Sequence, residues 1–173
     1  MAVTLLLGGA RAGKSTIAAR IASRWTGPVA LIATAEPRDE EMAARIARHR
    51  AERPPEWTTV EEPLDLVRAM DGLPPGAGVI LDCLTLWVSN AMEAELDDDE
   101  IEERARKAAA AAGARDGDLV AVSNEVGAGI VPANPLGRRF RDLLGRVNAI
   151  WAEHADRVLL VVAGRVVALG ELP

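Results

Sequence analysis

The amino-acid sequence predicts an α/β fold, in which helices cover both faces of a mostly parallel β-sheet. Short, continuous apolar runs alternate with segments of helical spacing, as in parallel sheets whose strands are buried on both faces. The 173 residues fall within the ~100–200 of a typical domain, so we expect a single domain over residues 1–173. The hydrophobic fraction of 49% suffices for a core and argues against disorder.

Six apolar runs are predicted to form the strands. The first is closed by the pair Gly8-Gly9, and a turn at Gly164 joins the last two. The predicted strands are Val3–Leu7, Val29–Ala33, Val79–Leu81, Leu119–Val122, Val158–Val162 and Arg165–Leu169.

Six further segments have the spacing or the boundary residues of helices. In the second of them, Met42, Ala43, Ile46 and Ala47 share one side, which we expect to face the core. The predicted helices are Lys14–Trp25, Asp39–Arg50, Leu64–Met70, Leu84–Met92, a helix from the acidic run Asp97–Glu100 to about Ala112 that Gly113 closes, and Leu136–His154.

Composition excludes several classes of protein. With 20 Lys and Arg against 26 Asp and Glu, the net charge is −6, which argues against a nucleic-acid partner. The single cysteine, Cys83, excludes an internal disulfide and a zinc site built from thiolates, and fits a reducing compartment. No apolar run approaches the ~18 residues of a membrane span, and no secretory signal precedes the first strand, so we expect a cytoplasmic protein.

The strongest motif is Gly-Gly-Ala-Arg-Ala-Gly-Lys-Ser at residues 8–15, which fits G-x-x-x-x-G-K-[ST] in full. A predicted strand precedes it and a predicted helix follows it, which is the context of the phosphate-binding loop in P-loop NTPases. Backbone N–H groups and the helix start would surround a phosphate, Lys14 would contact the β- and γ-phosphates, and Ser15 would bind Mg²⁺. The alternative is a chance glycine-rich turn.

Asp82 follows the apolar run Val79–Leu81, as in a Walker B element. At the carboxyl end of a parallel strand it would lie on the same sheet edge as the phosphate loop, where it would position a metal ion or water. The alternative is a helix N-cap.

A histidine surrounded by arginines is the third candidate. Arg45, His49 and Arg53 are spaced four apart, and Arg48 and Arg50 flank the histidine. Such a cluster favours a polyphosphate ligand, and a neutral imidazole is a competent nucleophile. The alternative is a solvated basic helix face, and the residues alone leave both open.

Together these pieces resemble one family, the bifunctional adenosylcobinamide kinase / adenosylcobinamide-phosphate guanylyltransferases of cobalamin biosynthesis. The resemblance extends over nearly the whole chain, and its most specific parts are Met42–Arg50 with Arg53-Pro54, and Asn124–Pro132. The sequence departs from the family pattern at Ala12, where we expect a serine, and matches it poorly over residues 93–118. Further matches are residues 8–15, Ile32–Thr34, the acidic residues 39–41, Trp57, Glu61, Ile80–Thr85, Phe140–Asp142 and Gly145–Asn148.

The resemblance implies two reactions with ATP and GTP as substrates and Mg²⁺ as cofactor. Adenosylcobinamide is phosphorylated; GMP from GTP is then carried on a histidine, here His49, to adenosylcobinamide phosphate. The catalytic residues would be His49, Lys14 and Asp82, and Ser15 and Asp82 would hold the metal. The implied nucleotide contacts are Gly8, Gly9, Ala10, Arg11, Ala12, Gly13, Lys14, Ser15, Ala33, Thr34, Ala35, Arg50, Ala51, Glu52, Arg53, Glu61 and Asp82.

Two points stay open. Glu61 is a candidate for reading the guanine base, but it is equally well a surface acid beside Glu62. The family includes trimers, so the resemblance allows a homo-oligomer that no sequence feature identifies. The alternative functions are a P-loop kinase of another small molecule without guanylyl transfer, and a nucleotide-binding module without catalysis.

Overall fold

One mixed sheet organises the molecule, with strand order β3-β2-β4-β5-β1-β6-β7. The computed structural model describes residues 1–51 and 53–170, and of Arg45 only the backbone. Neighbouring strands are parallel except β6 and β7, which form an antiparallel hairpin. The strands are β1 (Val3–Leu7), β2 (Val29–Ala33), β3 (Thr58–Glu61), β4 (Gly78–Leu81), β5 (Leu119–Val122), β6 (Arg157–Val162) and β7 (Arg165–Leu169).

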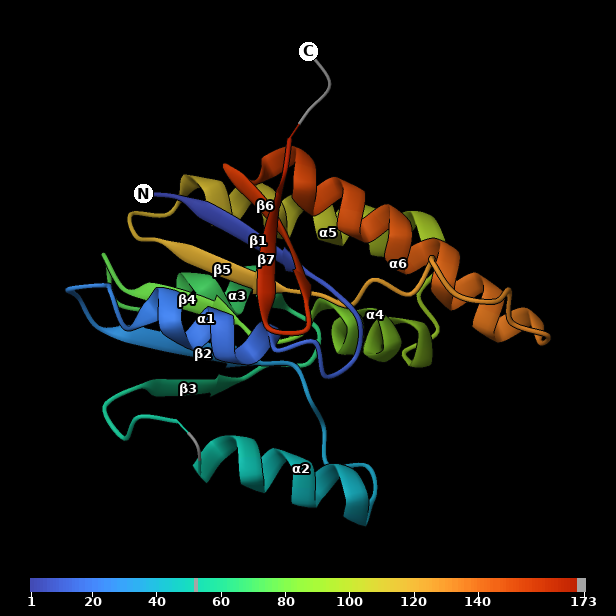
Figure 1. Ribbon diagram of the computed structural model, residues 1–173, viewed down its shortest axis with the longest axis horizontal. Helices are drawn as coiled ribbons and strands as arrows, with labels where there is room; N and C mark the ends of the chain where they lie inside the picture. Colours follow the sequence, from blue (N-terminus) through green and yellow to red (C-terminus); the bar gives the residue numbers. More distant parts are fainter. Residues whose placement is uncertain (52, 171–173) are drawn as a thin grey trace.

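Helices lie on both faces of this sheet (Figure 1), which confirms the predicted fold class. They are α1 (Lys14–Ala22), α2 (Glu40–Ala51), α3 (Leu66–Asp71), α4 (Leu84–Glu93), α5 (Asp98–Ala114) and α6 (Pro135–His154). Consecutive strand residues point to opposite faces, so Leu5 joins the core beneath α3 to α6, whereas Leu6 joins the core beneath α1.

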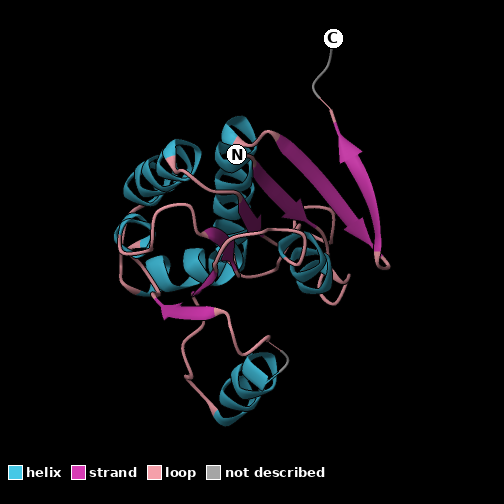
Figure 2. Cartoon of the chain, turned by 90° about the vertical axis from the view of Figure 1, so that its left-hand side faces the viewer, coloured by secondary structure: helices cyan, strands magenta, loops and turns pink. Residues whose placement is uncertain are grey.

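The prediction that α2 faces the core with an apolar side is wrong. Met42 and Ile46 are only half-buried, and Ala43 and Ala47 are exposed. Figures 1 and 2 show why: α2 connects β2 to the edge strand β3 and lies away from both faces of the sheet. No layer of the fold is therefore available to cover an apolar stripe.

Other elements begin or end one to three residues from their predicted bounds, as in α1, which ends at Ala22 and not at Trp25, and three further features differ from the predictions. Strand β3 was not predicted, and its residues are half-buried or exposed rather than a buried apolar run. Gly113 does not close α5, which continues to Ala114 before Arg115 turns into an extended conformation. Strand β7 is exposed throughout, because a strand at the sheet edge packs under no helix, so not every strand is buried on both faces.

Candidate functional site

The phosphate loop has the geometry that its sequence predicts. β1 ends at Leu7, α1 begins at Lys14, and Gly13, the N-cap of α1, has a φ of 100°, which favours glycine. The ammonium of Lys14 donates hydrogen bonds to the carbonyl oxygens of Gly8 (2.8 Å) and Gly9 (2.7 Å). The backbone of the loop thus positions the lysine at the place where a phosphate would bind.

Two neighbouring segments brace the loop. The N–H of Gly164, in the turn between β6 and β7, donates to the carbonyl of Ala12 (2.8 Å). From the other side, the N–H of Glu125, just after β5, donates to the carbonyl of Gly8 (3.1 Å). Residues far apart in the sequence therefore hold the loop, and no local motif reports them.

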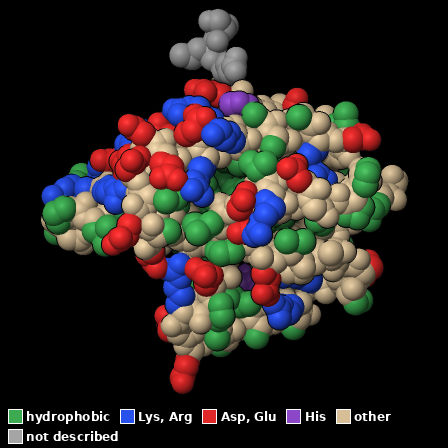
Figure 3. Space-filling model, turned by 180° about the vertical axis from the view of Figure 1, so that it is seen from behind, with side chains coloured by type: hydrophobic (Ala, Val, Ile, Leu, Met, Phe, Trp, Pro, Cys, Tyr) green, Lys and Arg blue, Asp and Glu red, His purple; other side chains and the backbone are tan. Residues whose placement is uncertain are grey.

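A pocket of about 290 Å³ brings together residues of three predicted groups. Ser15 of the phosphate loop, Asp82 after β4, and His49 and Arg53 of the arginine–histidine segment all line it. Figure 3, seen from the face opposite α1, shows a recess between α2 and the body of the molecule. The wall is completed by Thr16, Ala18, Ala19, Leu31, Pro54, Trp57 and Ile80.

The arginines in and around this pocket face acids. Arg53, whose side chain is 12% exposed, lies 3.7 Å from the Asp82 carboxylate and donates to the hydroxyl of Thr59 (3.4 Å). Arg50 forms an ion pair with Glu61 at the end of β3. Two arginines of the cluster therefore have carboxylates of the protein itself as partners.

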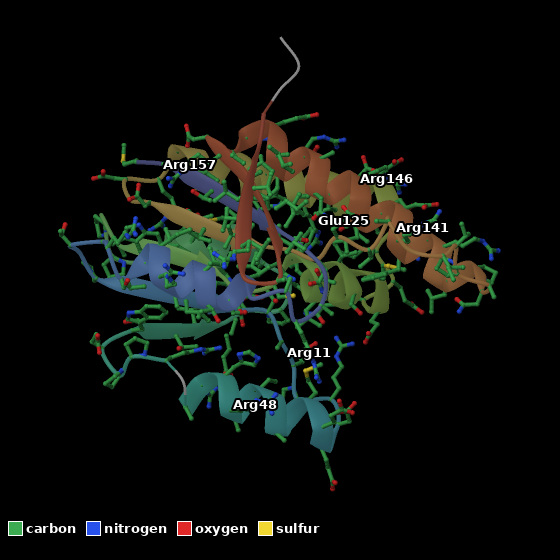
Figure 4. The ribbon with its side chains drawn as sticks, viewed as in Figure 1. Arg11, Arg48, Glu125, Arg141, Arg146 and Arg157 are labelled. Atoms are coloured by element: carbon green, nitrogen blue, oxygen red, sulfur yellow. The ribbon has the colours of Figure 1, made fainter. Side chains whose placement is uncertain are left out.

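Two further arginines, Arg11 and Arg48, do not line the pocket. Arg48 is exposed on α2, and Figure 4 shows Arg11 between the phosphate loop and α2. Arg53 lies beyond the end of α2, yet it still shares the pocket with His49. The predicted contact Glu52 and the side chain of Arg45 lie outside the described residues.

The segment after β2 is held from beneath by α4. Thr34 is buried, and its hydroxyl donates to the carbonyl of Cys83 (2.7 Å). The buried Asn90 donates to the carbonyl of Thr34 (2.8 Å) and accepts from Arg38 (2.8 Å). These bonds fix the point at which the chain leaves the sheet for α2, with Ala33 buried and Ala35 half-buried there.

The residues present fit a magnesium ion. The hydroxyl of Ser15 and the carboxylate of Asp82 line one pocket, and hard oxygen donors are the ligands that Mg²⁺ takes, together with phosphate oxygens and water. Within residues 1–51 and 53–170, no three His, Cys, Asp or Glu side chains gather as a metal-binding group. A site of this kind needs the phosphates of a nucleotide to complete it.

Cys83, next to Asp82, is not suited to nucleophilic chemistry. Burial raises the pKa of its thiol, and the neighbouring Asp82 carboxylate raises it further, against hydrogen bonds from the backbone of Leu86 and from Thr85. The thiolate form that would react is therefore disfavoured near neutral pH.

The sequence motifs missed two groups of residues around the site. The apolar wall formed by Leu31, Trp57 and Ile80 was not predicted, although a tryptophan three residues after Pro54 was a usable signal in a chain with few aromatic residues. Thr85 and Asn148 hold the backbone of Asn124 beside the phosphate loop, and only the folded chain reveals this. In the part of the chain that the structure describes, no helix is long and apolar enough to span a membrane.

Comparisons with known proteins show the family to which the chain is similar over nearly its whole length. Residues 4–169 match the family model described as cobinamide kinase / cobinamide phosphate guanyltransferase. The bifunctional adenosylcobalamin biosynthesis protein CobP of Pseudomonas aeruginosa is 41% identical over 161 residues, which cover 92% of each chain. The corresponding protein CobU of Salmonella typhimurium is 41% identical over 174 residues, covering 92% of this chain and 95% of the relative.

Solved structures of low sequence identity share the fold. A protein of Pyrococcus horikoshii aligns with a TM-score of 0.56 at 8% identity, covering 96% of this chain and 85% of that chain. The type III secretion ATPase EscN of enteropathogenic Escherichia coli aligns with a TM-score of 0.53 at 14% identity, covering 94% of this chain and 43% of that chain. At these identities the likeness concerns the fold alone.

Proposed function

The chain belongs to the cobinamide kinase / cobinamide phosphate guanyltransferase family, and from this premise we propose that it catalyses two successive transfers in the assembly of the cobalamin nucleotide loop. In the first, a nucleoside triphosphate phosphorylates the free hydroxyl of adenosylcobinamide. In the second, GTP gives its GMP group to adenosylcobinamide phosphate through a covalent intermediate on His49. The products are adenosylcobinamide-GDP and pyrophosphate.

One observation carries this proposal: a histidine and a phosphate loop border the same pocket. His49 comes from α2, Ser15 from the start of α1 and Asp82 from the end of β4. A plain phosphate loop needs no histidine beside it, whereas guanylyl transfer needs a nucleophile within reach of the nucleotide's α-phosphorus. In this pocket the phosphate loop and the proposed nucleophile lie together, although they come from separate elements.

In the kinase step, the oxygen of the substrate hydroxyl would attack the γ-phosphorus while the bond to the leaving nucleoside diphosphate breaks. The N–H groups of residues 8–13 and the ammonium of Lys14 would neutralise the charge that spreads over the phosphate oxygens. Lys14 is already directed into the loop by the carbonyls of Gly8 and Gly9.

In the guanylyl step, a ring nitrogen of His49 would attack the α-phosphorus of GTP. A P–N bond forms, the P–O bond to pyrophosphate breaks, and Arg53 neutralises charge on the oxygens. A phosphate oxygen of adenosylcobinamide phosphate then attacks the same phosphorus, the P–N bond breaks, and the imidazole is regenerated. Arg53 would exchange its partner Asp82 for phosphate during this cycle.

Ser15 and Asp82 would hold Mg²⁺, which polarises phosphate oxygens and offsets their charge when bound. The apolar wall of Leu31, Trp57 and Ile80 offers a face on which a nucleobase can pack. Glu61, at the end of the neighbouring strand β3, would read the N1–H and 2-amino groups of guanine. The other nucleotide contacts implied by the family resemblance stand as part of this proposal.

Product analysis tests the function. Purified protein with adenosylcobinamide, GTP and Mg²⁺ should form adenosylcobinamide phosphate and then adenosylcobinamide-GDP, separable by chromatography. With adenosylcobinamide phosphate supplied directly, only the second product should form. Absence of both products would refute the proposal, and accumulation of the phosphate alone would favour a kinase without guanylyl transfer.

A further inference from the structure

The segment that leads from β5 into the first turn of α6, residues 124–136, is fixed where it begins. The N–H of Asn124 donates to the hydroxyl of Thr85 on α4 (2.8 Å), and its carbonyl accepts from the amide of Asn148 on α6 (3.1 Å). Thr85 and Asn148 are both buried. Since the N–H of Glu125 donates to Gly8, the segment starts directly at the phosphate loop.

The same segment is fixed where it ends. Asn134 caps α6 by accepting from the N–H of Gly137 (2.6 Å). Arg138 reaches back and donates to the carbonyls of Pro132 (3.0 Å) and Ala133 (2.7 Å). Polar contacts therefore fix both ends of the segment, and Val126, near its start, is half-buried against the core.

Beyond Val126, three apolar side chains of the segment and of the first turn of α6 are exposed. Ile130 is 98% exposed, Val131 is 59% exposed, and Leu136, in the first turn of α6, is 66% exposed. A single exposed aliphatic residue is ordinary, whereas three exposed aliphatic residues within residues 130–136 are a reason to look for a ligand. Figure 1 shows the segment running from β5 to the tip of α6, and Figure 3 shows hydrophobic side chains at that end of the molecule.

We infer that Ile130, Val131 and Leu136 form the docking surface for the corrin macrocycle of the cobinamide substrate, an inference that rests on the proposed function. The substrate has an arm that ends in a hydroxyl or phosphate and a bulky ring edged by methyl groups. The pocket beside His49, at about 290 Å³, is at the small end of ligand sites (about 300–1,000 Å³) and is needed for the nucleotide. The macrocycle must therefore lie on an open surface that continues from the phosphate loop.

The strand order favours this segment over the other exposed apolar surface near the loop. β5 lies between β4, which Asp82 follows, and β1, which leads into the phosphate loop. A ligand on the segment after β5 can thus direct its arm between the two. The hairpin of β6 and β7, where Val166 and Val167 are exposed, lies on the opposite side of β1 from Asp82 and His49.

The test compares a loop variant with a matched hairpin variant. In the double variant Ile130→Ser with Val131→Ser, the KM for adenosylcobinamide should rise about tenfold or more, as expected from the lost burial of two aliphatic side chains. The kcat, the KM for the nucleotide and the uptake of label from GTP in the absence of corrinoid should stay within about twofold of wild type. Val167→Ser, with a similarly exposed valine, should leave all four quantities unchanged.

An unchanged KM for adenosylcobinamide in the loop variant overturns the inference. So does an equal rise in Val167→Ser, or a parallel loss of GTP labelling in a variant that keeps the wild-type unfolding temperature. Leu136→Ser tests the docking surface independently, because this substitution alters the first turn of α6 and leaves residues 130 and 131 unchanged. Equilibrium dialysis with cobinamide separates the two proposals: if the wild type neither binds nor phosphorylates it, the proposed function fails as well, whereas equal binding by wild type and loop variant removes only the docking surface.

Discussion

At the scale of single residues, the phosphate loop depends more strongly on one of its glycines, Gly8, than the motif indicates. A Cβ on Gly8 would lie 2.4 Å from the carbonyl oxygen of Val161 on β6, whereas a Cβ on Gly9 would have no atom within 4 Å. The two glycines occupy neighbouring positions of one motif, but only the first is pressed against another strand.

This contact predicts different outcomes for two similar substitutions. Gly8→Ala should force the loop away from β6, lower the free energy of unfolding by about 1–3 kcal/mol and weaken nucleotide binding. Gly9→Ala should change both quantities little. Urea unfolding and nucleotide titration of the two variants check this, and equal losses in both would contradict it.

Glu62 is one of the acids that stabilise the fold. Burial opposes its ionisation, but the N–H groups of Asp65 and Leu64 and the guanidinium of Arg68 outweigh burial and hold the pKa of Glu62 below its usual value. A depressed folded-state pKa adds stability that is fully present above the unfolded value, about 4.3, and is lost as the pH falls through the folded value. The contribution is therefore complete at neutral pH.

This carboxylate should show itself in the pH dependence of stability. Glu62→Gln should lower the free energy of unfolding at about pH 7, and its difference from wild type should shrink as the pH falls below about 4. Urea unfolding over this range measures the difference. A gap that stays constant with pH would mean that the charge of Glu62 contributes nothing.

At the scale of elements, α2 lies apart from both faces of the sheet. None of its described side chains is buried, and polar contacts connect its two ends to the body: Arg38 to Asn90 before the helix, and Arg50 to Glu61 at its end. Because α2 carries His49, the position of the proposed nucleophile rests on these contacts and on the residues that line the pocket.

The pair of Arg50 and Glu61 allows the two readings of Glu61 to be separated. Glu61→Gln should reduce the preference for GTP over ATP about tenfold, because guanine loses a charged acceptor. Stability should change by at most about 1 kcal/mol, since the pair is exposed. Kinetics with each nucleotide measure the preference.

The charge-swapped double variant, Arg50→Glu with Glu61→Arg, is the control. It can rebuild the ion pair between α2 and β3, but it leaves an arginine where the carboxylate would meet the base. The preference for GTP should therefore stay low. If the swap restores it, Glu61 serves only as the partner of Arg50.

At the scale of the whole molecule, the sequence predicts the buried centre best. β1, β2 and β5 have the predicted bounds, because a continuous apolar run between turn residues has few other places in an α/β fold. At the edges the outcome is mixed. β7 also has its predicted bounds, whereas β3 was missed because it is short, mixes threonine with valine and glutamate, and is half-exposed, so its pattern carries no clear period. The apolar spacing of α2 was misleading because periodicity does not reveal whether a surface is present to cover it.

In the candidate site, too, the sequence predicts some residues well and others poorly. Ser15 and Asp82 followed from motifs whose spacing is local, and both line the pocket. His49 was ambiguous from the residues alone, and only the fold brings it to the same pocket as Ser15. The bracing of the loop by Gly164 and Glu125 depends on contacts between distant segments, which no local pattern encodes.

The proposal that most needs testing is the covalent guanylyl group on His49, and the chain provides its own control in His154, the other of its two histidines. His154 lies at the end of α6, where its ring contacts the carbonyl of Ile150 (2.9 Å). Incubation with GTP labelled at the α-phosphate and Mg²⁺ should attach an acid-labile label to wild type and to His154→Ala, and none to His49→Ala. Failure of the wild type to take up label, or equal labelling of His49→Ala, would contradict the covalent mechanism.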